Sequence, residues 1–215
     1  VTNLRWNHLF SDKLFSNLSL IYSDYFYGLI LDFVGFEWDS GITNINFKYD
    51  FNHYLKDNFK LSYGVNNIYT KFNAGEIFPN RDDSGIIPFK LTEKYANEFA
   101  FYLEADHNIS DKFNLKYGLR FSNFIRLGQD ELNTYENDNP VIYNQQFQKY
   151  EPGIPNGSVS YERSDILKSF NNFEPRVSFS YLLNSDSSLK ASYNRMVQYL
   201  HLLSNTSSPT PLDIW

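Results

Sequence analysis

The sequence predicts an all-β chain of long antiparallel strands, and three observations carry this prediction. Aromatic residues make up 19% of the chain, with Phe 20 and Tyr 17, and such residues favour the pleated, half-buried surface of a sheet. Apolar and polar residues alternate with a period of two over segments longer than the usual strand of about 5–6 residues. Short polar turns and longer links separate these segments, which is typical of a meander of hairpins.

The alternation divides the 215 residues into eight strands. It is clearest in 113–122, where every odd-numbered residue is aromatic or aliphatic and the even-numbered ones are Asn, Lys, Gly, Arg and Ser. Boundaries placed in this way carry an error of about 2–4 residues. The predicted strands are 2–10, 14–30, 36–55, 59–77, 95–109, 113–130, 169–183 and 189–203.

The connections between these strands are of two kinds. Short polar turns are predicted at 11–13, 56–58, 110–112 and 184–188. Longer links are predicted at 31–35, 78–94 and 131–168, the last of them rich in Asn, Asp, Gln, Pro and Gly and expected to be a large irregular loop. In a meander every second connection lies on the same edge, so the short turns share one edge and the long links the other. This asymmetry is typical of outer-membrane barrels.

The same alternation also fits a soluble β-sandwich, and two further features favour a membrane. A tilted membrane strand needs about 9–11 residues, and several predicted strands exceed that. A barrel wall shows lipid only with every second residue, so the negative mean hydropathy is compatible with it. The face opposite the apolar one carries charges, at Lys48, Asp50, Glu98, Glu104, Asp106, Lys116 and Arg120. We therefore predict a transmembrane barrel wall in the bacterial outer membrane, with lipid as a partner.

Composition excludes several classes of function. The net charge is -6 and no basic cluster is present, so we expect no nucleic-acid partner. The chain has no cysteine, which excludes disulfides and thiolate metal sites. Gly-rich phosphate loops, a GxSxG elbow and a HExxH motif are absent. Because carboxylates are common in a barrel lumen, those on the polar face do not by themselves indicate catalysis. We expect no enzyme activity, no catalytic residues and no cofactor.

Two groups of residues were weighed as metal sites. His8, His53 and His107 stand at the same offset before a short turn, in a hairpin plan that the sequence repeats. On alternate strands they would lie about 10 Å apart, whereas ligands must lie about 2 Å from one ion. We interpret these three as interfacial residues near the periplasmic rim; the fourth histidine, His201, does not precede a short turn. The Asp-rich segment 81–85 lacks the spacing of a calcium loop and is predicted to be a solvated turn.

Tyr and Trp near strand ends are expected at the membrane–water boundary, where the ring meets lipid and the polar atom meets water. Ordinary aromatic packing explains each of them equally well when taken singly. The residues concerned are Trp6, Tyr22, Tyr25, Trp38, Tyr69 and Tyr199.

Three segments carry a resemblance to a known family. The alternating strand 113–122 with its Asp-containing turn, and the stretch 189–199 continuing through 206, resemble the barrel domain of TonB-dependent outer-membrane receptors. The most specific match is 210–215, Thr-Pro-Leu-Asp-Ile-Trp, which is similar to a loop of the Thr-Pro-Leu-Asp-x-Trp kind in many such receptors. The resemblance covers essentially the whole chain.

The resemblance implies a plugged barrel of about 22 strands that imports a scarce large solute: an iron chelate, cobalamin, an oligosaccharide or a peptide. Energy would come through a periplasmic coupling protein. No plug domain is recognisable, and Pro209 and Pro211 indicate a loop, so 1–215 is interpreted as one barrel region, a middle fragment of a larger barrel. Solute capture is expected in the long links, above all 131–168, although no motif identifies ligand-binding residues.

Two alternatives to the importer remain. A self-contained eight-stranded barrel with an adhesive or structural role is compatible with the strand count, because eight strands can close around an interior filled by side chains. A soluble carbohydrate-binding sheet domain would need loops of comparable length at both edges.

Overall fold

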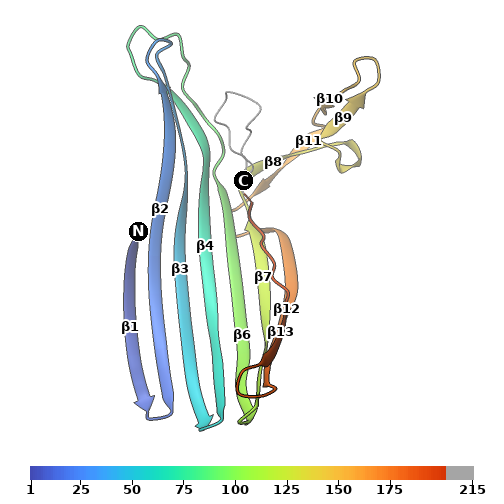
Figure 1. Cartoon of the computed structure of the whole chain (residues 1–215). Coiled ribbons are helices and arrows are strands. Elements are labelled where there is room, and N and C mark those ends of the chain that lie inside the picture. Colours follow the sequence, from blue (N-terminus) through green and yellow to red (C-terminus); the bar gives the residue numbers. More distant parts are fainter. Residues whose placement is uncertain (202–215) are drawn as a thin grey trace.

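A computed structural model describes residues 1–201 and consists almost entirely of β-strands (Figure 1). The main sheet is an antiparallel meander in the order β1-β2-β3-β4-β6-β7-β12-β13, and the short β5 pairs with β4. Its strands are β1 (Thr2–Ser11), β2 (Leu14–Leu31), β3 (Phe36–Lys56), β4 (Phe59–Pro79), β5 (Phe89–Lys90), β6 (Lys94–Ser110), β7 (Phe113–Leu127), β12 (Ile166–Leu182) and β13 (Ser188–Asn194). The predicted fold class is confirmed, and the first seven predicted strands are confirmed to within three residues at each end.

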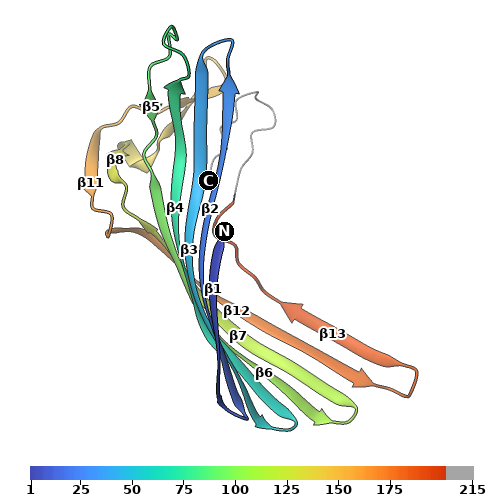
Figure 2. The same cartoon turned by 90° about the vertical axis from the view of Figure 1, so that its left-hand side faces the viewer.

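The sheet is strongly curved and twisted, but it does not close within the described residues (Figure 2). β1 and β13 are its two edges and do not pair with each other. Within the described residues no helix is long and apolar enough to cross a membrane.

The last predicted strand, 189–203, is shorter in the structure. Pairing between β12 and β13 ends at Arg176 and Asn194, and residues 195–201 then leave the sheet. The next residue of β12 is Pro175, which accepts a 3.1 Å hydrogen bond from the Arg195 amide but has no N–H to donate in return. Pro175 therefore removes one hydrogen bond of the ladder at the point where the pairing ends. The predicted end of the strand and the 210–215 motif lie outside the described residues.

The link predicted as an irregular loop, 131–168, is also more ordered than expected. It contains two small antiparallel ribbons, β8 paired with β11 and β9 with β10, and its base is closed by a 2.9 Å hydrogen bond from the Gly128 amide to the Asp165 carbonyl. In the outer ribbon Tyr143 and Tyr150 are directly opposite, with ring centroids 5.1 Å apart, a cross-strand contact that holds the pair. The elements are β8 (Asp130–Thr134), η1 (Glu136–Asp138), β9 (Val141–Asn144), β10 (Lys149–Pro152) and β11 (Gly157–Tyr161). We call residues 128–165 the arm.

The predicted asymmetry of the two sheet edges is confirmed in most respects. Two-residue turns and the 183–187 turn share one edge, and the 80–93 link and the arm extend from the other (Figure 1). The exception is 31–35, predicted as a longer link. Residues 32–35 make a tight turn, closed by a 3.1 Å hydrogen bond from the Val34 amide to the Leu31 carbonyl. Gly35 ends it with φ +69°, a left-handed conformation that favours glycine.

The sheet has an apolar face and a polar face, as the alternation predicts. Residues directly opposite one another form transverse rows, and one such row on the apolar face contains no charged residue. It runs through Trp6, Leu18, Tyr49, Val65, Phe101, Phe121 and Phe173. Many side chains of this face are exposed in the isolated chain, including Phe101 at 49% and Phe173 at 58%. The apolar face therefore lacks a covering layer of protein within the described residues.

Candidate functional site on the polar face

One transverse row of the polar face joins five strands. Asp50, Gly64, Tyr102, Arg120 and Glu174 are directly opposite one another across β3, β4, β6, β7 and β12. The Tyr102 hydroxyl donates a 2.7 Å hydrogen bond to Asp50, and Arg120 Nε lies 3.6 Å from a Glu174 oxygen. We call these residues the central row.

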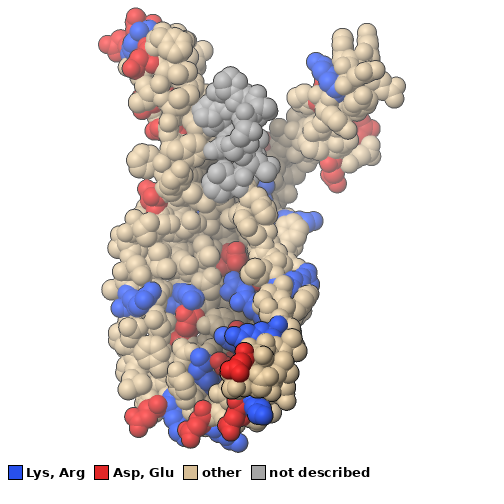
Figure 3. Space-filling model, viewed as in Figure 1, with Lys and Arg blue, Asp and Glu red and all other residues tan. Residues whose placement is uncertain are grey.

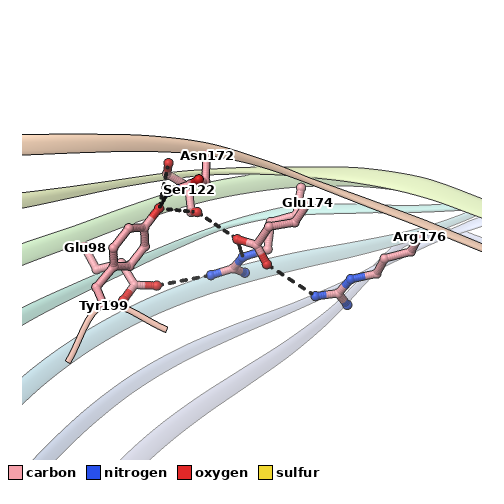
Figure 4. A network of polar contacts seen from close by, with 7 residues as sticks. Glu98, Ser122, Asn172, Glu174, Arg176 and Tyr199 are labelled. Carbon is pink, nitrogen blue, oxygen red and sulfur yellow. Dashed lines mark hydrogen bonds and ion pairs between the residues drawn. The ribbon is translucent and has the colours of Figure 1, made fainter. Parts of the chain in front are cut away.

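Glu174 is a charged residue that is only 4% exposed. Its carboxylate accepts a 2.7 Å hydrogen bond from the Ser122 hydroxyl and lies 4.0 Å from the Arg176 guanidinium (Figure 4). The Arg120 guanidinium contacts the same carboxylate at 3.6 Å. Arg120 also contacts Glu98 at 3.5 Å. A buried carboxylate is tolerated where it is paired and hydrogen-bonded, and these contacts supply both conditions. Removing Arg120 or Arg176 would leave the negative charge of Glu174 only partly compensated.

Other ion pairs extend the pattern over the half of the face nearer the short turns, where Figure 3 shows charges of both signs. Lys48 pairs with Asp50 at 2.9 Å and Lys116 with Glu104 at 3.0 Å. The lysines are about half exposed, so each pair stabilises the sheet by at most about 1 kcal/mol. The polar-face charges that the sequence predicts are thus brought together as neighbours of opposite sign.

Residues 195–201 cross the polar face, and we call them the strap (Figure 1). The Tyr199 ring stacks on Phe124 with centroids 5.1 Å apart. Its hydroxyl lies 2.8 Å from Ser122 Oγ and accepts a 3.0 Å hydrogen bond from Asn172 (Figure 4). Leu200 packs with Tyr199 on a buried apolar cluster of Phe72, Ala96 and Phe124. The strap therefore docks where the polar face is locally apolar.

A second cluster of charges lies at the long-link end, outside the central row. Glu93 accepts a 2.6 Å hydrogen bond from the Tyr95 hydroxyl and pairs with Lys71 at 2.9 Å and Lys90 at 3.7 Å. Burial raises the pKa of Glu93, but hydrogen bonds from Tyr95 and Lys71 and the nearby cations outweigh it and lower the pKa below its ordinary value. Lys90 also pairs with Glu76 at 3.1 Å, and that hydrogen bond raises the pKa of Lys90.

The histidines lie apart from these clusters. His8, His53 and His107 fall on the apolar face near the short-turn edge, each on a different strand. His8 contacts aromatic rings on both sides, and His107 packs edge-on against Phe59 at 5.0 Å. His201 lies in the strap, with Nε2 3.2 Å from the Gln198 carbonyl. Within the described residues no group of three His, Cys, Asp or Glu side chains could hold a metal ion.

The segment 81–85, predicted to be a solvated turn, tethers two links of the long-link edge. Ser84 donates a 2.7 Å hydrogen bond to the Gly35 carbonyl, and Arg81 pairs with Asp83 at 3.1 Å. The Arg81 and Asp83 side chains are therefore paired with each other, and the Ser84 hydroxyl is bonded to the 32–35 turn.

The aromatic residues predicted at a membrane boundary divide into two groups. Trp6 and Tyr22 are exposed on the apolar face, and Tyr69 lies on that face against Tyr95. The prediction is wrong for Trp38, Tyr199 and Tyr25. Trp38 is 1% exposed, because its ring packs on Gly75 and edge-on against Tyr27. Tyr199 lies in the strap, and by register Tyr25 faces the polar side.

The arm extends beyond the main sheet (Figure 2), and it carries exposed apolar side chains. Phe147 is 62% exposed, Tyr150 75% and Ile154 86%. The sequence predicts the arm as a capture loop, but no spacing within it distinguishes these three side chains from residues of an ordinary loop.

A comparison with family models gives one match, described as "Outer membrane beta barrel domain", over residues 34–212. No curated protein and no solved structure matches the chain significantly. The matched residues include β3 to β13 with the arm, the central row and the strap. The finer assignment to TonB-dependent receptors remains a prediction, whereas location in the bacterial outer membrane follows from the match. The chain belongs to the outer membrane beta barrel domain family.

Proposed function

We propose that this chain is part of the wall of a TonB-dependent receptor that imports a scarce large solute, such as an iron chelate, cobalamin, an oligosaccharide or a peptide, and catalyses no reaction. The observation that carries the proposal is the open sheet. Eight long strands leave β1 and β13 as unpaired edges within the described residues. Exposed edges of this length are a liability for any sheet, and additional strands of a larger barrel would cover them.

Each face of the sheet suits one side of such a wall. The charge-free row of aromatic and aliphatic residues on the apolar face, several of them exposed, fits contact with lipid hydrocarbon. The ion pairs of the polar face fit a wet lumen that holds a plug domain. The arm and the 80–93 link, at the end away from the short turns, would face the cell exterior and meet the solute first.

Cysteine cross-linking distinguishes this wall from a closed eight-stranded barrel with an adhesive or structural role. The chain has no cysteine of its own. Variants of the protein that carries it would place one cysteine in β1, at Asn3, Arg5 or Asn7, and one in β13, at Ser188, Lys190 or Ser192. In a larger barrel these pairs stay unlinked under mild oxidation, because β1 and β13 are not neighbours. The pair Ser178→Cys/Ser192→Cys is the positive control, since those residues are directly opposite.

Import itself is tested in cells that express the whole protein. Uptake of radiolabelled iron chelates, cobalamin, oligosaccharides and peptides would be compared with and without a protonophore, and with residues 130–164 of the arm replaced by a short Gly-Ser linker. We expect uptake of one class to need the proton gradient and to fall when the arm is replaced. A β1–β13 cross-link together with uptake that ignores the protonophore would overturn the proposal in favour of the small barrel.

A further inference from the structure

We infer that a hollow in the polar face, next to the strap, binds a protonated amine carried on an apolar body. The hollow has a volume of about 280 Å³ and is walled by β2, β3, β4, β6 and β7, with Leu200 of the strap beside them. It lies apart from the Lys48 and Arg176 end of the face, where a separate hollow is lined by cations. Binding there requires the barrel wall alone and does not depend on import.

Two polar groups of this hollow, on Asn46 and Glu98, can accept a further hydrogen bond. Asn46 Oδ1 is buried and has no hydrogen-bond partner among residues 1–201, and a buried acceptor left unpaired costs free energy. Among the described residues that line the hollow, Glu98 is the only one with a charged side chain. Its contact with Arg120 is long, at 3.5 Å. The wall therefore presents an unsatisfied oxygen and a weakly paired carboxylate.

These two acceptors are placed to share one donor group. Asn46, Ile68 and Glu98 are directly opposite one another across β3, β4 and β6. A ligand group held above Ile68 then has an amide oxygen on one side and a carboxylate on the other. An ammonium group carries three donors and a positive charge, and no acceptor, so it matches both. A carboxylate or phosphate would be repelled by the Glu98 carboxylate.

Most of the remaining wall is apolar and would take the body of the ligand. Ile21, Ile42, Ile68, Phe124 and Leu200 line it. A volume of this size fits a short branched or aromatic chain rather than a whole large solute. Such an amine could belong to a solute in the lumen or to a lysine side chain of another part of the same protein that fills the barrel. The shared chemistry is an ammonium group on an apolar stem.

The test uses the whole protein in lipid vesicles, with Ser23→Cys as a reporter because Ser23 lines the hollow and any other cysteine is replaced. The rate of modification is measured with a cationic (aminoethyl) and an anionic (sulfonatoethyl) methanethiosulfonate. We expect the cationic reagent to react about tenfold faster. Isopentylamine should slow the reaction, whereas isopentanol should not.

Matched variants show which charge is responsible. Glu98→Gln should abolish the preference and the protection by isopentylamine, and Glu98→Asp should retain them. Glu104→Gln is the control, because Glu104 lies on the same face of the same strand but pairs with Lys116 outside the hollow. If a lysine of the protein already fills the site, the thiol is protected from the start and a carbodiimide couples Glu98 to that lysine. Equal rates for both reagents in every variant, with no such coupling, overturn the inference.

Discussion

The Tyr102 hydroxyl donates a 2.7 Å hydrogen bond to Asp50, although the two residues are separated by a whole strand. Gly64 of β4 lies between them in the central row. Because glycine has no side chain, the tyrosine ring can extend over it to reach β3. This hydrogen bond therefore joins β6 to β3 across β4.

Removing this hydroxyl should measurably weaken the wall. We expect Tyr102→Phe to lower the free energy of unfolding by about 1–2 kcal/mol, because Asp50 loses a neutral donor and keeps only its pair with Lys48. Urea unfolding in lipid vesicles, followed by tryptophan fluorescence, measures the change. Tyr117→Phe is the control, since the Tyr117 hydroxyl has no hydrogen bond within the described residues. Equal losses in the two variants would contradict the assigned role of the bond.

The glycine in the middle of this row should be equally sensitive. A Cβ at Gly64 would lie 2.5 Å from the Tyr49 carbonyl oxygen and 3.0 Å from an Asp50 carboxylate oxygen. We expect Gly64→Ala to destabilise the barrel by about 1–3 kcal/mol, since the backbone of β3 must move. A Cβ at Gly85 has nothing within 4 Å, so Gly85→Ala should leave the unfolding midpoint unchanged. Equal unfolding midpoints for the two variants would contradict a clash between the new Cβ and the backbone of β3.

Most of the sheet can be predicted from the sequence because alternation is a local property. Leu119 and Arg120 are adjacent in β7 and must point to opposite faces, so the alternation alone assigns the apolar and polar sides. The contacts of Glu174 cannot be obtained in this way. Its neighbours Ser122 and Arg120 lie on another strand, and they meet it only in one register between β7 and β12. The sequence places these residues on the same face but does not pair them.

The end of β13 shows where local pattern fails. The row that ends at Pro175 contains Leu103 and Leu119 on the apolar face. If β13 continued in register, Arg195 would be the next residue in this row. An arginine facing hydrocarbon costs about 2–4 kcal/mol at the bilayer midplane. By leaving the sheet, the chain avoids that cost and gains the stacking of Tyr199 on Phe124.

A substitution at Arg195 tests this explanation. We expect Arg195→Leu to let β13 extend along β12, so that the amides of 196–200 exchange their hydrogens at least about tenfold more slowly. Hydrogen exchange followed by mass spectrometry measures the change. Lys190→Leu is the matched control, because Lys190 lies on the polar face opposite Ser180 and its removal should not alter the strap. Unchanged exchange in the Arg195 variant would show that another contact directs the strap.

The strap should also depend on the Tyr199 hydroxyl. This group lies 2.8 Å from Ser122 Oγ, and Asn172 donates to it at 3.0 Å. We expect Tyr199→Phe to speed trypsin cleavage after Arg195 by about fivefold, because one net hydrogen bond of about 1 kcal/mol is lost. Cleavage of the parent protein at the same concentration is the reference. Tyr193→Phe, on exposed β13, should cleave at the parent rate, and an equal acceleration there would contradict the assignment.

The charge cluster at the long-link end should make that region sensitive to acid. The folded chain holds the pKa of Glu93 below its ordinary value of 4.5, so the carboxylate binds fewer protons when folded than when unfolded. Its contribution is therefore complete at neutral pH and is lost as the pH falls below about 4.5 through the lowered pKa. The contact affected joins Glu93 to Lys71 of β4, which holds the 80–93 link against the sheet.

Limited proteolysis of this link between about pH 6 and about pH 3, with an acid-active protease, measures the effect. Cleavage of the link, corrected for the protease's own pH profile on an unfolded substrate, should rise as the pH falls through this range. Glu93→Gln should remove most of the rise, because the glutamine cannot titrate and already lacks the ion pairs at neutral pH. Glu136→Gln, in the exposed η1 turn of the arm, should retain the full rise. If Glu93→Gln also retains it, another carboxylate must control the acid response of this link.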